Sequence, residues 1–401
     1  MHTFAPFLAV LAAIIVLTAF LRAGLRRAGP PPLVAFLLIG LALTAADARW
    51  ALFDPVHEEV LAFLGKMGVI VLLFRVGLES DVPGLLRQLR SAGLIWIGNV
   101  VASFALGYLC ARHVLDFDLI PSIFLGTALT ATSLGVTVPI WRRQKKLSSR
   151  PGELLVDVAE LDDISGVVLM ALLFGVAPAL HSGDGESTAL LGSVFAQGGW
   201  LLTKLLLFGA ACLGFSRFLE PHVTGFARRI ESEASCMLTI VAVGIFTAAI
   251  AGCLGFSVAI GAFFGGLAFS RDPQATHLEP VFLPLYHLFA PFFFIHIGYR
   301  LAPDALVGGL ALGSVLALAA AGGKLLGALP PAAWVGGGAT ALLVGLSLIP
   351  RAEIAMVILG HGRRLGDWAT PPEAFAAGCV VVALTCILTP LILRPAIRRL
   401  A

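Results

Sequence analysis

Charged residues are scarce in this sequence, and no stretch of it is both long and polar. Of its 401 residues, 13% are charged and 58% are hydrophobic, and the mean hydropathy is +0.95. These values lie outside the range of soluble globular domains. The composition therefore argues against a soluble enzyme or a soluble binding module, and we expect no cofactor and no nucleic-acid partner.

Cysteine is also sparse, and it is not arranged for cross-linking or metal binding. All of the cysteines fall in apolar segments, and no two of them have the CxxC spacing of a zinc or redox motif. We therefore expect neither a disulfide framework nor a zinc site. We interpret the six cysteines as packing residues: Cys110, Cys212, Cys236, Cys253, Cys379 and Cys386.

Apolar runs recur along the whole chain, each of about 20 residues and so long enough to cross a hydrocarbon core of about 30 Å as a helix. Strands of a membrane barrel would be shorter and would alternate in polarity. The sequence thus predicts an all-α polytopic membrane protein with about thirteen transmembrane helices. The predicted segments are 4–21, 31–46, 59–78, 91–112, 119–140, 152–178, 190–217, 234–252, 255–270, 281–299, 305–329, 336–360 and 374–393.

Basic residues are distributed unevenly among the predicted loops, which by the positive-inside rule places the N-terminus outside and the C-terminus in the cytoplasm. The segment 4–21 follows an N-terminus without basic residues, and no clear cleavage site follows it, so we expect a retained span. The predicted cytoplasmic side carries Arg22, Arg26, Arg27, Arg87, Arg90, Arg142, Arg143, Lys145, Lys146, Arg150, Arg217, Arg228, Arg229, Arg271, Arg394, Arg398 and Arg399. The opposite side carries Arg49, Arg300, Arg363 and Arg364.

Two predicted segments combine polar residues with a helix breaker. The segment 119–140 contains threonines and serines before Pro139, and the segment 336–360 contains polar residues around Pro350. Unwound backbone at membrane depth is stable only where it is buried in protein or lines a wet cavity. Each segment is the fifth of six in its half of the chain, with 190–217 as a connector. We therefore expect two inverted-topology repeats with two broken, crossing helices at a transport site.

Asp162 and Asp163 lie in the middle of the predicted segment 152–178. A carboxylate at the bilayer centre is disfavoured by ~2.5–3.5 kcal/mol on insertion scales, so two adjacent carboxylates need a reason to be there. Adjacent positions differ by ~100° around a helix, so we expect different partners for the two acids. The alternative is that both are buried polar residues satisfied by hydrogen bonds between helices, a role that adjacent acids serve poorly.

Two further acids precede this pair at helical spacing. Asp157, Glu160 and Asp163 are three residues apart, which places them on one stripe of the helix. Because the stripe leads inward from the predicted cytoplasmic end, we predict a cation-attracting funnel with Asp157 and Glu160 on its wall.

Lys324 is the predicted partner of one aspartate, because the glycines that flank it allow another helix to approach its ammonium group. The alternative is that Lys324 extends to the cytoplasmic interface, as lysine side chains can. Arg351 and Glu353 are predicted to form a second buried pair that fixes the broken helix.

In order and spacing these features resemble the monovalent cation/proton antiporter family, which includes bacterial sodium/proton antiporters and Kef-type potassium/proton antiporters. The resemblance spans nearly the whole chain, with departures at Asp157, Glu160, His296 and Ala352. It is carried by Pro30–Pro32, Val71–Glu79, the threonine-rich break, Asp162-Asp163, Leu254–Ser257 with Gly261–Phe263, Gly323-Lys324 and Pro350–Glu353.

The resemblance implies a homodimer in the lipid of the bacterial inner membrane, with a dimerisation domain and a six-helix core domain in each subunit. It assigns residues 1–90 and 219–303 to the dimerisation domain, 91–180 and 304–401 to the core domain, and 181–218 to a linker helix. No nucleotide-binding domain follows Ala401, which argues against Kef-type ligand gating on the same chain.

The resemblance also implies a function and a site. We predict an antiporter that exchanges protons for a monovalent cation, with sodium favoured, by alternating access, in the service of pH homeostasis. The double aspartate resembles the electrogenic members of the family. The implied roles are cation ligand and proton carrier for Asp163, partner of Lys324 for Asp162, and donors of carbonyl and hydroxyl oxygens for Thr130, Thr132 and Ser133.

The sequence leaves alternatives open. Potassium or lithium can take the place of sodium, and electroneutral potassium/proton exchange is the second candidate function. A gated cation channel, with the acids as a selectivity ring, would show no proton coupling. A membrane sensor or scaffold would transport neither cation nor proton.

Overall fold

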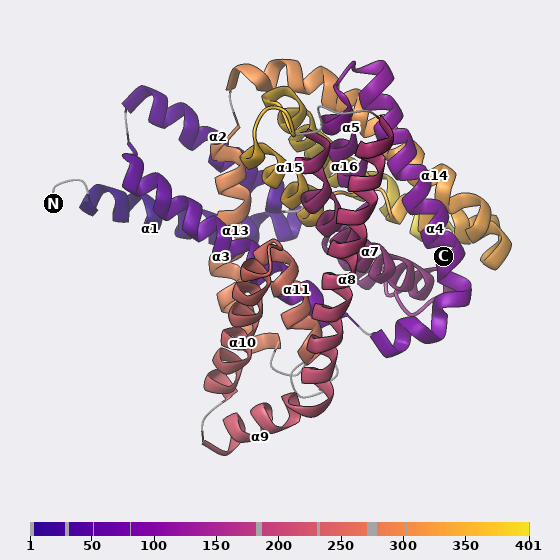
Figure 1. Cartoon of the computed structure of the whole chain (residues 1–401), viewed down its shortest axis with the longest axis horizontal. Coiled ribbons are helices and arrows are strands. Elements are labelled where there is room, and N and C mark those ends of the chain that lie inside the picture. Colours follow the sequence, from indigo (N-terminus) through magenta and orange to yellow (C-terminus); the bar gives the residue numbers. More distant parts are fainter. Residues whose placement is uncertain are drawn as a thin grey trace. The chain divides into compact units, whose positions relative to one another are not determined.

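The chain is helical throughout the part described by the computed structural model, which comprises residues 4–28, 32–50, 52–80, 82–181, 187–230, 233–270, 279–301 and 303–400. No strand occurs among these residues, in agreement with the predicted all-α class. Figure 1 shows the arrangement of the helices. They are α1 (Phe4–Ala28), α2 (Pro32–Trp50), α3 (Pro55–Glu79), α4 (Val82–Leu109) with a π-helical turn (Cys110–Val114), α5 (Leu119–Ala128), α6 (Leu134–Arg143), α7 (Arg150–His181), α8 (Ser187–Phe218), α9 (Glu220–Ile230), α10 (Glu233–Cys253), α11 (Val258–Phe269), α13 (Glu279–Tyr299), α14 (Pro303–Ser347), α15 (Glu353–Leu365) and α16 (Pro372–Leu400).

The helices account for the predicted membrane segments. Ten described helices are long and apolar enough to cross a membrane. One of them, 304–347, contains the predicted segment 305–329 and the first part of 336–360. Gly337 interrupts α14 between the two with a φ of +81° that glycine adopts without strain. The predicted segments 119–140 and 255–270 contain the short apolar helices Leu119–Ala128 and Val258–Phe269. Together with α15, which contains the last part of 336–360, these helices cover the predicted segments.

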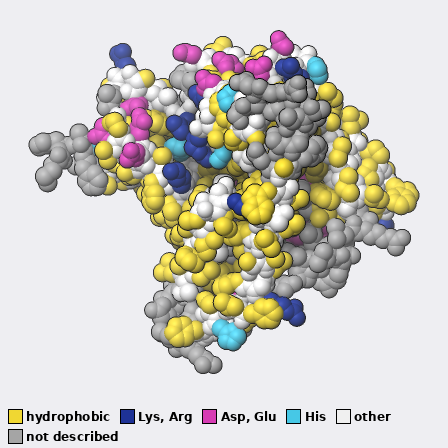
Figure 2. Space-filling model, in the orientation of Figure 1, with side chains coloured by type: hydrophobic (Ala, Val, Ile, Leu, Met, Phe, Trp, Pro, Cys, Tyr) yellow, Lys and Arg dark blue, Asp and Glu magenta, His cyan; other side chains and the backbone are white. Residues whose placement is uncertain are grey.

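Large hydrophobic side chains lie on the outside of the helices, as expected for surfaces that face lipid. Figure 2 shows them over the region of α8 and α10. Trp200, Leu206 and Leu207 of α8 and Leu238 and Phe246 of α10 are each more than half exposed. A soluble protein would present a polar surface there.

The chain divides into two compact units. The first comprises Met1–Ile15, Leu52–Asp81 and Ala171–His296, and the second comprises Val16–Ala51, Val82–Met170 and Ile297–Ala401. The broken helices and both aspartates lie in the second unit. The dimerisation role assigned from the sequence to residues 1–90 and 219–303 stays a prediction.

In the first unit, glycines bring α3 and α11 into backbone contact. A Cβ at Gly77 would clash with the carbonyl oxygen of Phe263, and one at Gly266 would clash with that of Phe74. Close packing through small residues is the usual way for helices to associate in lipid. The start of α3 is fixed separately, since the Asp54 side chain accepts a hydrogen bond of 2.9 Å from the His57 backbone amide.

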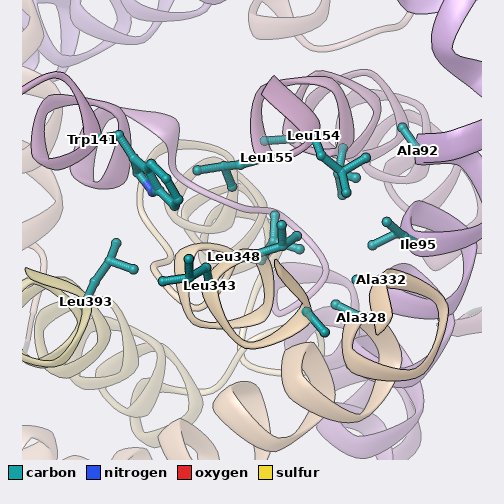
Figure 3. Packing of buried hydrophobic residues seen from close by; sticks show 14 of the residues in the cluster. Ala92, Ile95, Trp141, Leu154, Leu155, Ala328, Ala332, Leu343, Leu348 and Leu393 are labelled. Carbon is teal, nitrogen blue, oxygen red and sulfur yellow. The ribbon is translucent and has the colours of Figure 1, made fainter. Parts of the chain in front are cut away.

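In the second unit, an apolar core joins α4, α6, α7, α14 and α16. Figure 3 shows Trp141 of α6, Leu155 of α7 and Leu348 beyond the end of α14 pointing into this core, with Leu393 of α16 at its edge. Trp141 is fully buried, and its indole donates a 3.0 Å hydrogen bond to the Ser347 hydroxyl. The core therefore packs α6 against the end of α14, next to both helix breaks.

Candidate functional site

Two broken helices meet in the second unit. The chain leaves helical geometry after Ala128 and resumes it at Leu134, and it does so again between Ser347 and Glu353. The Ser133 amide donates to the Pro350 carbonyl over 2.9 Å. The breaks predicted from the sequence are present, and they satisfy part of each other's backbone hydrogen bonding.

Asp162 of α7 lies beside these breaks and is surrounded by hydrogen-bond donors. The residue is 1% exposed. The Thr132 hydroxyl donates to Oδ2 over 2.6 Å, and the Asn99 amide donates to Oδ1 and Oδ2 over 2.8 and 2.6 Å. Lys324 forms an ion pair of 2.8 Å with the same Oδ2. This carboxylate therefore has its charge balanced by protein groups within the described residues.

Lys324 is fully buried, so it does not extend to the membrane interface. Its ammonium also donates to the Thr130 carbonyl over 2.6 Å. A Cβ at Gly323 would lie 2.8 Å from the Ser103 Cα, and one at Gly98 would lie 2.6 Å from the Gly327 carbonyl oxygen. Glycine thus lets α4 and α14 touch next to the ammonium group, as the sequence around Lys324 predicts.

Asp163 has different surroundings from its neighbour. The residue is 9% exposed, and no hydrogen bond or ion pair to its side chain occurs within the described part of the chain. On the same face of α7, one turn later, a Cβ at Gly166 would lie 3.4 Å from Ile354 and 3.8 Å from Ala131. Asp163 therefore faces the crossing of the two breaks as a buried acid without a counter-charge bonded to it.

Arg351 and Glu353 each have hydrogen-bond partners of their own, and the buried pair predicted for them stays a prediction. Arg351 is fully buried, and its guanidinium donates to the carbonyls of Leu348 and Ile349 over 2.9 and 2.7 Å and to that of Ala320 over 3.3 Å. Glu353 accepts a 3.0 Å hydrogen bond from the Ser133 hydroxyl. The carbonyls at the C-terminal end of α14 favour the positive charge of Arg351.

The sequence as a whole matches one family of transporters. The family model described as "Sodium/hydrogen exchanger, transmembrane" matches residues 10–399. The chain belongs to this exchanger family. It is an integral membrane protein and a cation/proton antiporter, and its relatives are transporters rather than enzymes.

Relatives of this exchanger cover most of its length. It is 29% identical to the high-affinity Na+/H+ antiporter NhaS3 of Synechocystis, over 89% of this chain and 76% of the relative. It is 29% identical to the Na+/H+-K+ antiporter GerN of Bacillus cereus, over 92% and 90% of the two chains. The structure of the sodium/proton antiporter MjNhaP1 of Methanocaldococcus jannaschii has a similar fold, with a TM-score of 0.69, 15% identity and 99% coverage of both chains.

Asn99 is a member of the exchanger's site that was not predicted from the sequence. It is fully buried in α4 and holds both oxygens of Asp162. The sequence does mark Asn99 as unusual, since it is a polar amide in the middle of an apolar segment and follows a glycine. A search for charged residues alone does not find it.

Asp157 and Glu160 lie on α7 of the exchanger and are half-buried. Neighbouring positions on another stripe of the same helix, Leu154, Leu155 and Val158, are packed in the apolar core. The helix therefore has an acidic stripe and a buried apolar stripe. The funnel role of the acidic stripe stays a prediction.

No group of three or more histidine, cysteine, aspartate and glutamate side chains in the described part of the exchanger is arranged to hold a metal ion. The transported cation is substrate rather than a resident metal. A monovalent cation also accepts hydroxyl and carbonyl oxygens, so its site needs fewer carboxylates than such a group contains.

Proposed function

We propose that this exchanger expels sodium in exchange for protons, with Asp163 as the carboxylate that binds either the cation or a proton. The observation that carries the proposal is the contrast between the two aspartates. Asp162 is held by Lys324, Thr132 and Asn99, whereas Asp163 is buried with no such partner in the described residues. A buried carboxylate without a counter-charge is unfavourable, so it takes up a proton or a cation.

Competition for Asp163 explains exchange and gives the sign of its pH dependence. Protons and sodium cannot neutralise the same carboxylate at once, so each displaces the other. Alternating access then requires only that the loaded core move and expose the site to one side at a time. At lower pH more sites carry a proton, so the apparent KM for sodium rises as pH falls.

The pair of Asp162 and Lys324 supports electrogenic exchange. When Lys324 transfers a proton and Asp163 transfers another, two protons cross for one sodium ion. Potassium is the second candidate cation, because the relatives include the Na+/H+-K+ antiporter GerN and the K+/H+ antiporter subunit KhtU of Bacillus subtilis. We further propose that the protein works as a homodimer in the bacterial inner membrane, with its N-terminus outside.

The test is proton movement in proteoliposomes that contain the purified protein. Addition of sodium is expected to move protons, faster under a favourable clamped potential, and Asp163→Ala is expected to abolish the movement. Equal rates at all potentials would contradict electrogenic exchange. Persistent exchange by Asp163→Ala would contradict the assignment of Asp163 as the binding carboxylate. If potassium alone moved protons, potassium rather than sodium would be the substrate.

A further inference from the structure

Glu353 connects the two broken helices. It is the first residue of α15, and its Oε2 accepts a 3.0 Å hydrogen bond from the hydroxyl of Ser133, the residue that precedes α6. Its Oε1 lies 3.6 Å from the position of a Cβ on Gly135 in the first turn of α6. The carboxylate thus lies at the N-terminal ends of two short helices, where the helix dipoles favour negative charge.

Glu353 and Asp163 both lie near the crossing of the two broken helices. Asp163 and Gly166 share a face of α7, and Gly166 packs against Ile354, the residue next to Glu353. Glu353 is close enough to Asp163 for the two negative charges to repel each other, as Asp162 and Glu160 also do. The carboxylates of Asp163 on α7 and Glu353 on α15 therefore both contribute negative charge near the helix crossing.

The buried cations of this region are bonded elsewhere. Lys324 bonds Asp162 and the Thr130 carbonyl at the end of α5, and Arg351 bonds carbonyls at the end of α14. In both broken helices a protein cation thus lies at the C-terminal end of the first half, as helix dipoles favour. Neither cation bonds Asp163, which is about nine-tenths buried.

We propose that Glu353 is a second carboxylate ligand of the transported cation and shares that cation with Asp163. The inference rests on the proposed function and deepens it by completing the ligand set. Hard cations bind several oxygens at once, and a cation between Asp163 and Glu353 would offset the repulsion of the two carboxylates. When the cation leaves, these carboxylates take up protons, and the protons offset the repulsion in the same way. This role replaces the structural one predicted from the sequence for Glu353.

The experiment compares Glu353→Gln, Glu353→Asp and Asp163→Asn with the wild type in purified protein. Sodium binding is measured by calorimetry, and exchange is measured in proteoliposomes. We expect Glu353→Gln to weaken sodium binding by roughly ten- to hundredfold, since one charged ligand is lost, and Glu353→Asp to weaken it less. The glutamine can still accept the Ser133 hydrogen bond, so a purely structural role would leave sodium affinity unchanged.

A matched control and a double variant make the result specific. Glu59→Gln makes the same change at an exposed position of α3 and is expected to keep wild-type affinity. The variant with both Asp163→Asn and Glu353→Gln is expected to lose less affinity than the sum of the two single losses, because both residues bind one ion. Fully additive losses would contradict a shared ion.

The failure of this inference differs from the failure of the proposed function. If the wild type exchanges sodium for protons and Glu353→Gln binds sodium as the wild type does, the inference fails and the function stands. If the wild type shows no exchange, the function fails. Should Glu353→Gln not fold, Glu353→Asp keeps the charge, and unchanged affinity in that variant would overturn the inference.

Discussion

Asp162 and Asp163 are adjacent in sequence and differ in surroundings, because a helix turns their side chains about 100° apart. One carboxylate faces Lys324 and Asn99, and the other faces the helix crossing. The first is stabilised by fixed protein groups. The second has no such bond among the described residues, which is why we propose it as the carboxylate that binds the cation or a proton.

Replacement of Asn99 is expected to destabilise the protein. Asn99→Ala removes both amide hydrogen bonds to the Asp162 carboxylate, each of them to a charged group. We expect a loss of about 2 kcal/mol in the free energy of unfolding, measured by thermal or denaturant unfolding in detergent. Ser314→Ala, at an exposed serine of α14 that bonds only its own helix, is the control and should change little. Equal stability of both variants would show that the amide contributes nothing to holding Asp162.

Replacement of Lys324 is expected to change both stability and voltage dependence. Lys324→Met leaves the buried Asp162 charge without its cation, which typically destabilises by about 3–5 kcal/mol. In folded protein, sodium/proton exchange should continue without its dependence on membrane potential. Unfolding in detergent and exchange under a clamped potential measure the two effects. Lys66→Met, at an exposed lysine of α3, is the comparison, and voltage-dependent exchange by Lys324→Met would rule out the lysine as the second proton carrier.

At the level of helices, contact between α4 and α14 positions Asn99 and Lys324 on the same carboxylate. Their backbones touch at Gly98 and Gly327, where a side chain of any size has no space. The two helix breaks also contact each other, because the Ser133 amide in one donates a hydrogen bond to the Pro350 carbonyl in the other. The site is therefore a product of helix contacts rather than of any one helix.

Two glycine-to-alanine variants within α14 test this contact. A Cβ at Gly327 would meet the backbone of Gly98 and Asn99, so Gly327→Ala is expected to lower stability by about 2 kcal/mol or more. A Cβ at Gly308 meets nothing within 4 Å, so Gly308→Ala should be neutral, or stabilising by up to about 1 kcal/mol. Thermal unfolding in detergent distinguishes them. The same melting temperature for both would show that α4 and α14 can separate without cost.

The acidic stripe of α7 is expected to affect how fast cations arrive. Asp157→Asn together with Glu160→Gln removes two negative charges on the approach to Asp163, so the apparent KM for sodium should rise roughly two- to fivefold at low ionic strength. The effect should shrink as an impermeant salt is added, because salt screens exposed charges. A rise in KM that is independent of salt would point to a role inside the site instead of a funnel.

At the scale of the whole molecule, one cysteine reports the orientation in the membrane. Cys253 is exposed at the end of α10, whereas the other cysteines are buried. With the N-terminus outside, this position follows the eighth predicted segment and lies outside the cell. A membrane-impermeant maleimide applied to intact cells should label the wild type and not Cys253→Ser. Labelling only after the membrane is opened would reverse the predicted topology.

The sequence by itself predicted the elements of this protein because each carries a local signal. Apolar length predicts the membrane helices, Pro350 and the threonines before Pro139 predict the breaks, and charge in an apolar segment singles out Asp162, Asp163 and Lys324. The family resemblance rests on the same features, and the match over residues 10–399 confirms it.

The tertiary structure decided which groups face each other, because helix contacts between distant parts of the chain have no local signal. It brought Asn99 to Asp162, turned Arg351 to backbone carbonyls, and brought Glu353 to the Ser133 hydroxyl. The predicted Arg351–Glu353 pair stays a prediction, and the bonds of Arg351 to the carbonyls of Leu348 and Ile349 had no signal in the sequence. In lipid, a buried charge binds the carbonyls and polar side chains that lie nearest to it. Which groups these are depends on how the helices pack, and the sequence alone does not show it.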